Sequence, residues 1–414
     1  MRNIFIAFVF IFNSFSAFAH TDADLNQKHF WLKFKAKDKF ERSKIADLGF
    51  SMETIVEDSI YTVVNEEMLK VAKKSGLLVQ YFEVNNQMLD FPEEDEKFHN
   101  YAELQAAYEN LANQYPELVR VSSIGKSVEG REIYMLTFST VEDDKSKPAI
   151  IFMGAHHARE HLSVETPLLL AQHLASQYAA GNERIVKLLN NRTVYIAPLI
   201  NPDGKEFDVR TGNYQLWRKN RRLNSGRVFG VDLNRNYGFG WGGGGASTNP
   251  SSETYRGTNA FSEPESRAVR DFVTSHDNIT TLLSFHTYSQ LILYPWGHKY
   301  ESIENTRDLQ VHETMARKMA EWNGYTPQQS SELYIASGDT TDWSYGELGI
   351  ISFTFELDPR GGFGGGGFYP GQDFIQPVFE KNLEPCLYLI DYADNPYRVL
   401  ESTAETYGLK SALF

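Results

Sequence analysis

The 414-residue chain has almost no cysteine, because Cys386 is the only one. A disulfide within the chain is therefore excluded, and stability must come from packing and from any bound metal. Cys386 lies in an apolar, helix-like run from 378 to 390. A lone cysteine in such a run is usually a small buried side chain rather than a reactive thiol, so we expect it to be buried.

Positive charge is also scarce. The chain has 40 Lys and Arg against 54 Asp and Glu, which gives a formal net charge of -14. Nucleic-acid binding rests on a basic surface, so a nucleic-acid partner is not expected. Beyond the first residues there is no apolar run of the about 20 residues that a membrane span requires, so stable membrane insertion is not expected either.

The N-terminus carries the one long apolar segment. Arg2 precedes an almost wholly apolar core from Ile4 to Phe12, and Ala17-Phe18-Ala19 offers a small-x-small cleavage site. The core is too short for a membrane anchor. We therefore predict a signal peptide at residues 1–19 and a secreted protein, either periplasmic or extracellular.

Residues 20–97 form a compact unit of their own. Strand-like runs at 30–34, 60–64 and 77–84 alternate with helix-like runs at 39–48 and 66–74. This order predicts a small α+β domain with its helices on one face of a sheet. The charged stretch 92–97 contains no large apolar residue and is typical of an exposed linker that proteases cut.

Residues 98–393 show the pattern of a second and larger domain. A helix is expected at 101–115, and the expected apolar strands are 133–138, 149–153, 194–199, 281–285 and 350–355. Because helical patterns separate most of these strands, the fold class is predicted as α/β, with a mixed central sheet covered by helices on both faces. The tail 394–414 has no assigned role, and a monomer is the default expectation.

Three potential metal ligands follow apolar strands. His157 and Glu160 are three positions apart just after the strand at 149–153, and His286 follows the strand at 281–285. Histidine nitrogens and carboxylate oxygens are zinc ligands, and a catalytic zinc site has three protein ligands and one open position. The pattern therefore indicates a catalytic zinc site.

The same segment allows a second interpretation. His157-Ala158-Arg159-Glu160-His161 also matches the inverted H-x-x-E-H zinc pattern, in which the two histidines bind the metal. That pattern requires a helix, whereas the helical run here begins only at Val164. We therefore favour His157 and Glu160 over the inverted pair.

These residues are part of an ordered series that resembles the zinc carboxypeptidases of the carboxypeptidase A and B type (peptidase family M14), including secreted bacterial members. The resemblance covers roughly residues 98 to 393. The series consists of Gly154, His157-Ala158-Arg159-Glu160, Asn201-Pro202-Asp203-Gly204, Leu216-Trp217-Arg218-Lys219, Val231-Asp232-Leu233-Asn234-Arg235-Asn236, His286-Thr287-Tyr288-Ser289-Gln290, Tyr334, Asp342-Trp343-Ser344-Tyr345 and Phe353-Thr354-Phe355-Glu356-Leu357.

The resemblance implies one zinc ion per chain, bound by His157, Glu160 and His286. Asp232 would orient the His157 imidazole as a second carboxylate behind the ligand. Glu356 would act as the general base that assists attack by zinc-bound water. Arg218 would stabilise the oxyanion of the tetrahedral intermediate.

The resemblance also implies an exopeptidase that releases single residues from peptide or protein C-termini. Arg159, Asn234 and Arg235 would receive the terminal carboxylate of the substrate, because a guanidinium matches a carboxylate with two parallel hydrogen bonds. Tyr334 would close over the bound terminus. An endopeptidase would have no free carboxylate to neutralise at this position.

Specificity is expected to depend on Thr341 and Asp339. At the position of Thr341 the family has an apolar residue in enzymes that take aromatic ends and an aspartate in those that take Lys or Arg. Asp339 stands where vertebrate members have glycine. We therefore expect a pocket that accepts hydrophobic or aromatic ends and basic ends, and that rejects acidic ends.

The N-terminal unit has the position and size of the prosegment of exported members. We expect an inhibitory and folding-assisting prosegment that a protease releases by cutting near Lys97, which makes the chain a zymogen; a permanent accessory domain is the alternative. Two other functions stay open: a cell-wall peptide amidase on the same fold, and a non-catalytic peptide-binding module. The module is disfavoured because the three ligands, Arg218 and Glu356 are all present.

Overall fold

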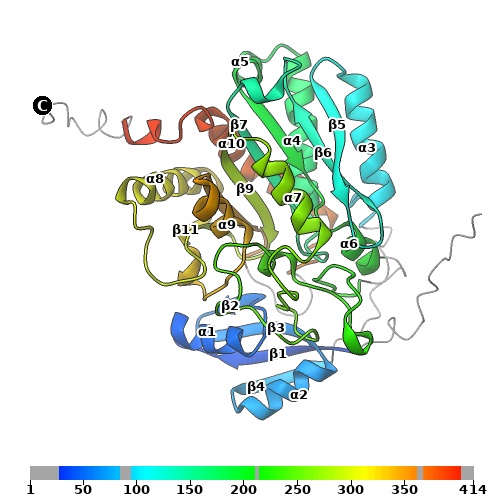
Figure 1. The fold of residues 1–414 in the computed structure, drawn as a ribbon, viewed down its shortest axis with the longest axis vertical. Helices are drawn as coiled ribbons and strands as arrows, with labels where there is room; N and C mark the ends of the chain where they lie inside the picture. The colour runs from blue at the N-terminus through cyan, green and yellow to red at the C-terminus, as the bar shows by residue number, and fades with distance from the viewer. Residues whose placement is uncertain (1–27, 84–94, 210–213, 361–366, 402–414) are drawn as a thin grey trace, which may run out of the picture.

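The computed structural model describes residues 28–83, 95–209, 214–360 and 367–401 (Figure 1). The predicted signal peptide at 1–19 and linker residues 92–94 lie outside this part of the chain. Among the described residues, no helix is both long and apolar enough to cross a membrane.

The N-terminal unit, residues 28–83, is a four-stranded sheet covered by two helices. Its elements are β1 (His29–Lys35), α1 (Lys39–Asp47), β2 (Thr54–Val56), β3 (Ser59–Asn65), α2 (Glu66–Ser75) and β4 (Leu78–Glu83), with strand order β2-β3-β1-β4. Successive side chains of β1 point to opposite faces of the sheet. Leu32 and Phe34 pack with Ile45 and Met68 of the helices, whereas Trp31 faces the other way and packs against Leu216 of the large unit.

The large unit, residues 95–401, is built around an eight-stranded mixed sheet of order β11-β10-β12-β9-β7-β8-β6-β5. Its strands are β5 (Val119–Lys126), β6 (Glu132–Phe138), β7 (Ala149–Gly154), β8 (Thr193–Ala197), β9 (Ile279–Thr287), β10 (Leu291–Tyr294), β11 (Thr326–Gln329) and β12 (Ile351–Leu357). Its helices are α3 (Tyr101–Gln114), α4 (Leu162–Ala179), α5 (Glu183–Asn191), α6 (Pro202–Val209), α7 (Pro264–Thr274), α8 (Thr306–Asn323), α9 (Thr340–Leu348) and α10 (Ile375–Tyr392).

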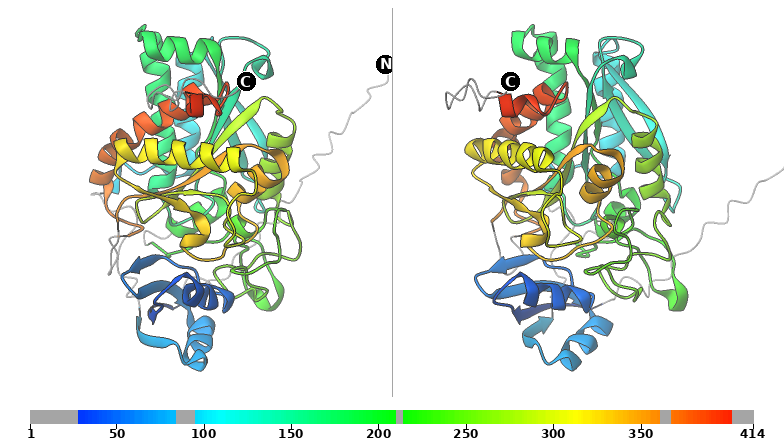
Figure 2. Two further views of the ribbon diagram at one scale, coloured as in Figure 1. Left: turned by 90° about the vertical axis from the view of Figure 1, so that its left-hand side faces the viewer. Right: turned by 60° about the vertical axis from the view of Figure 1, so that its left-hand side comes forward.

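Helices cover both faces of this sheet, as Figures 1 and 2 show. Ile150 and Phe152 of β7 join the core formed with α3, α4, α8 and α10. Ile151 and Met153 point to the opposite face and join the core formed with α7 and α9. Residues buried on both faces of a parallel strand explain why β7 is a continuous apolar run. The predicted α/β class with a mixed sheet is confirmed.

Three strands of the large unit were not predicted, namely β5, β10 and β11. Strands β5 and β11 are the edge strands of the sheet, and β10 lies next to β11. Strand β5 carries polar residues and β11 contains Pro327, whereas β10 (Leu291–Tyr294) is apolar but only four residues long. Edge strands need only a short or partly polar pattern, so the apolar signal fails there. Strand β2 of the small unit was not predicted because it is only three residues long.

The C-terminal segments pack on the helical layer. Cys386 of α10 is 1% exposed, as expected, and burial raises the pKa of its thiol. Beyond α10, Val399 is buried in the main core, and the hydroxyl of Tyr397 donates to Asp308 of α8 over 2.6 Å. The described part of the tail is therefore part of the folded domain.

Candidate active site

The site lies where the carboxyl ends of three neighbouring parallel strands meet. Strand β9 pairs in parallel with both β7 and β12. His286 lies near the end of β9, and Glu356 of β12 is its direct partner in the sheet register. Ligand sites in α/β sheets form at the carboxyl ends of such strands. The sheet register therefore fixes the position of Glu356 relative to His286.

The loop after β7 is held close to the start of α4. A side chain at Gly154 would bring its Cβ to 2.0 Å from the carbonyl oxygen of Ser163, so only glycine allows this approach. The Ser163 hydroxyl accepts a hydrogen bond from the backbone N–H of Ala155 and donates to the carbonyl of Glu160. These contacts fold the loop so that Glu160 turns toward the end of β9.

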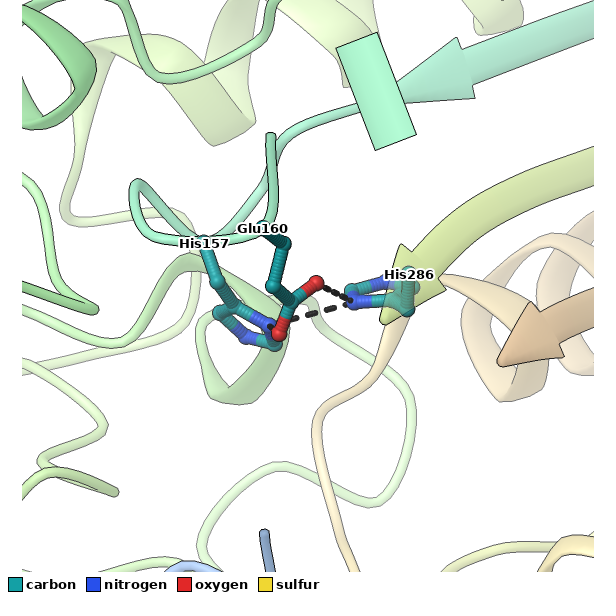
Figure 3. Close-up of side chains that lie close together, drawn as sticks. All are labelled: His157, Glu160 and His286. Atoms are coloured by element: carbon teal, nitrogen blue, oxygen red, sulfur yellow. Dashed lines mark hydrogen bonds and ion pairs between the residues drawn. The ribbon is translucent and has the colours of Figure 1, made fainter. Parts of the chain in front are cut away.

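His157, Glu160 and His286 converge on one point (Figure 3). The two carboxylate oxygens of Glu160 lie 2.7 Å from Nδ1 of His157 and 2.9 Å from Nδ1 of His286. The two Nδ1 atoms are 3.1 Å apart, and all three side chains are buried. Ligands around a tetrahedral zinc are separated by about 3.4 Å, so a small outward rotation of these side chains makes room for the ion.

The protonation of His157 suits a metal ligand. Its Nε2 lies 3.1 Å from a carboxylate oxygen of Asp232, which places the proton on Nε2 and leaves the lone pair of Nδ1 for the metal. His161 is engaged elsewhere, with its Nε2 2.9 Å from Asp208 and its Nδ1 2.7 Å from the ammonium of Lys205. The inverted histidine pair is therefore not formed, and the donor set fits zinc.

Asp232 connects the metal ligands to Arg218. Its second oxygen accepts from Nε and Nη2 of Arg218 over 3.1 and 3.0 Å. Burial alone would raise the pKa of Asp232, but the adjacent Arg218 and His157 outweigh it, and the pKa lies well below that of an ordinary aspartic acid. Asp232 is therefore ionised and compensates the buried guanidinium.

Glu356 is the half-buried carboxyl opposite His286. Burial, followed by the negative charge of Glu160, raises the pKa of Glu356 well above that of an ordinary glutamic acid. A raised pKa makes the carboxylate a stronger base, and a bound cation would counter part of the rise.

Asn234, Arg235 and Tyr334 lie together. Nη2 of Arg235 is 3.4 Å from the Tyr334 hydroxyl, and its Nε and Nη1 donate to the carbonyls of Gly245 and Asn234 over 3.0 and 2.7 Å. Asn234 is anchored in turn by its backbone N–H, which donates to Asp232 over 2.9 Å. Three of the predicted binders of a carboxylate, Asn234, Arg235 and Tyr334, are thus brought together.

Arg159 has other partners. Within the described residues it makes no hydrogen bond or ion pair with Asn234 or Arg235. Its Nη2 instead lies 2.5 Å from a carboxylate oxygen of Glu53, in the N-terminal unit, and its Nη1 lies 3.4 Å from Glu253. Neither acid was singled out from the sequence, because nothing in the local pattern distinguishes a glutamate that pairs with a residue 106 positions away.

Asp339 and Thr341 lie at the start of α9. One oxygen of Asp339 accepts from the backbone N–H groups of Thr341 and Asp342, so it caps the helix. Burial and then the charge of Asp342 raise the pKa of Asp339 to about 8. The hydroxyl of Thr341 is 2.6 Å from that of Thr354, two residues before Glu356.

Comparison with known proteins decides the family. A family model described as zinc carboxypeptidase matches residues 104–385. The chain belongs to the zinc carboxypeptidase family. It is 38% identical over 323 residues to a zinc carboxypeptidase of Saccharothrix mutabilis subsp. capreolus, which covers 76% of this chain and 74% of the relative. It is also 34% identical over 304 residues to carboxypeptidase B of Bos taurus, covering 72% and 71%.

Solved structures agree with this assignment. Thrombin-activatable fibrinolysis inhibitor superposes with a TM-score of 0.72 at 26% identity, covering 89% of this chain and all of that one. Carboxypeptidase A from Helicoverpa armigera gives a TM-score of 0.71 at 26% identity, covering 89% and 98%. The chain is thus a metallocarboxypeptidase, an enzyme of peptide C-termini with zinc as its cofactor.

Proposed function

We propose that this carboxypeptidase releases single hydrophobic, aromatic or basic residues from peptide C-termini, with Glu356 as the general base. Zinc, when bound by His157, Glu160 and His286, polarises water and the scissile carbonyl. The Glu356 carboxylate takes a proton from the attacking water and later gives it to the leaving amine, so that the C–N bond breaks and the base is restored. The Arg218 guanidinium stabilises the oxyanion that forms on the carbonyl oxygen.

The pairing of Glu356 with His286 across β12 and β9 is the observation that carries this proposal. This pairing supports a role for Glu356 as the base because Glu356 lies next to a metal ligand. The donor groups of Asn234, Arg235 and Tyr334 support binding of a free carboxylate. The test uses blocked dipeptides ending in Phe, Leu, Arg, Lys and Glu, and protein freed of its N-terminal unit, with and without a zinc chelator. Chelator-sensitive release of Phe and Arg supports the proposal. If zinc binds but no dipeptide is cut, the hypothesis of a cell-wall amidase or of a peptide-binding module is favoured instead.

The raised pKa of Asp339 predicts that preference changes with pH. A carboxyl with a pKa of about 8 is largely neutral at pH 6.5 and charged at pH 9, whereas an Arg side chain keeps its charge throughout. We expect kcat/KM for Arg ends, divided by that for Phe ends, to rise about tenfold over this range. The measurement is the pH profile of both substrates.

Asp339→Asn provides the matched variant. Asparagine caps helices as well as aspartate does, so α9 stays intact while the charge is removed. The ratio should lose its pH dependence, and Phe release should stay close to that of the parent enzyme. An unchanged preference for Arg ends in this variant would show that Asp339 does not interact with the side chain of the terminal residue.

We propose that the N-terminal unit is an inhibitory prosegment. Its Arg42 donates to the carbonyls of Glu332 and Leu333, and its Ser43 accepts from the N–H of Ile335, so it holds the segment that carries Tyr334. Glu53 of the same unit forms an ion pair with Arg159 of the large unit. The likeness to thrombin-activatable fibrinolysis inhibitor supports this proposal, because a coverage of 89% exceeds what the large unit alone supplies.

Replacing Glu53 by Gln is expected to raise the activity of the uncleaved chain about tenfold. The change removes the carboxylate that pairs with the fully buried Arg159. Because a buried cation without its partner is strongly unfavourable, the contact between the N-terminal unit and the large unit should weaken. The measurement is peptide release before and after proteolysis, where the cleaved forms should be equally active. Glu57→Gln, in the exposed turn between β2 and β3, is the control and should leave both activities unchanged.

The start of the large unit limits where the activating protease can cut. Asp95 accepts from the N–H of Gln372 over 2.7 Å and from the Tyr214 hydroxyl over 3.0 Å, and the N–H of Lys97 donates to Gln372. Because cleavage requires a locally open chain, we propose that these contacts must open before a protease can cut near Lys97. We further propose that the enzyme is exported; its predicted signal peptide lies outside the described residues.

A further inference from the structure

We infer that Thr340 is a positioning residue that fixes the amide of Asn234 for the substrate's terminal carboxylate; this inference rests on the proposed function. The side-chain oxygen of Asn234 accepts from the backbone N–H of Thr340 over 3.0 Å and from its hydroxyl over 2.9 Å. Thr340 is the first residue of α9, so a helix end supplies both contacts.

The backbone contact settles which way the amide faces. A backbone N–H can only donate, so the Asn234 atom beside it is the oxygen rather than the nitrogen. Two donors use both lone pairs of that oxygen. The NH₂ group therefore faces away from α9 with both of its N–H donors, and a carboxylate accepts such donors strongly.

A second set of contacts holds the Thr340 hydroxyl. Its only hydrogen is used toward Asn234, so in any hydrogen bond with Nε2 of His156, 3.3 Å away, the hydroxyl oxygen is the acceptor. The same Nε2 is 2.9 Å from the Tyr237 hydroxyl, and the His156 ring stacks on His286 at 5.6 Å between centroids. Thr340 thus lies between His156, which stacks on the zinc ligand His286, and Asn234, which we propose receives the carboxylate.

The amide would rotate more freely without the hydroxyl. Thr340→Val keeps the shape and the backbone N–H but removes one of the two donors, whereas Thr340→Ser keeps both. In protein freed of its N-terminal unit, with a blocked dipeptide ending in Phe, we expect Val to raise KM about fivefold with kcat changed less than twofold. Ser should stay within twofold of the parent, and Asn234→Ala should raise KM about tenfold, which is the loss of a hydrogen bond to a charged group.

A double-mutant cycle separates positioning from general structural damage. If Thr340 acts through Asn234, then Thr340→Val adds less than a twofold change in KM once Asn234 is Ala. Thr281→Val in β9 is the control for the substitution itself, since the buried Thr281 hydroxyl has no hydrogen-bond partner within the described residues. That variant should leave KM unchanged.

A second measurement distinguishes a loss of carboxylate recognition from poor folding of the Thr340→Val variant. The inhibition constants of 3-phenylpropionate and of 3-phenylpropanamide are compared, because only the acid offers a carboxylate. Val should reduce the preference for the acid about fivefold, and Thr340→Ala should do the same. Equal factors for Thr340→Val with and without Asn234 would overturn the inference. An Asn234→Ala variant with parent KM and parent acid preference would overturn the proposed carboxylate site itself.

Discussion

Replacing Glu356 by Gln is expected to lower kcat by about 10³-fold or more while the protein still binds one zinc ion. A positioned general base contributes about 10² to 10⁴-fold, and in the proposed mechanism the same carboxyl also returns the proton to the leaving amine. Gln keeps the shape of the strand end but has no basic oxygen. Because Glu356 is not among the three converging ligands, zinc content should stay at that of the parent. Steady-state kinetics and metal analysis on the cleaved protein provide the measurement.

The control is Glu313→Gln on α8, where the half-buried carboxylate forms an ion pair with the exposed Arg317. Surface pairs contribute little, so this variant should match the parent in kcat and in zinc content. A Glu356→Gln enzyme that keeps more than a tenth of the parent kcat would show that another group takes the proton.

Replacing Asp232 by Asn is expected to affect binding of the metal, catalysis and stability together. Asp232 is fully buried and accepts from His157, Arg218 and the N–H of Asn234. Loss of a carboxylate behind a metal-binding histidine costs about 10- to 100-fold in metal affinity. Loss of the partner of the buried Arg218 costs about 3–5 kcal/mol of folding free energy. We expect kcat/KM to fall about 10³-fold, because Arg218, which we propose stabilises the oxyanion, also loses the carboxylate that holds it in place.

Zinc affinity by competition with a chelator and unfolding in urea give the two separate readouts. Asp308→Asn serves as the control, since Asp308 is a buried acid that accepts from Tyr345 and Tyr397, neither of which is a predicted metal ligand. It should lose stability but keep its zinc affinity. Equal zinc affinities in the two variants would mean that Asp232 does not act on His157.

The centre of the fold could be predicted from the sequence, and the edges could not. Strand β7 is buried on both sides and is an unbroken apolar run, while β9 and β12 are buried strands in which apolar residues are interspersed with Thr and Ser. Their apolar residues locate the strand ends near which His286 and Glu356 lie. Strand β11 contains Pro327 and two glutamines, and its pairing with β10 depends on tertiary contacts. Local pattern gives no information about such a pairing.

The candidate site shows the same division. The metal ligands follow strands and share a recognisable spacing, so they could be named in advance. The pairing of Glu53 with Arg159 joins two units of the chain, and no periodicity predicts it. The helix-capping contact of Asp339 could have been found, because an aspartate just before a helix is a known start signal. It was missed because the residue was considered only as a pocket group.

The register between β9 and β12 has a consequence for redesign. The position of Glu356 relative to His286 is set by backbone pairing in the middle of the sheet, whereas Asp339 and Thr341 belong to a helix start and its preceding loop. Changes of side chain in that loop leave the sheet ladder intact. With the roles proposed above for Asp339 and Thr341, the accepted terminal residue can be exchanged by engineering this loop, while turnover depends on the sheet.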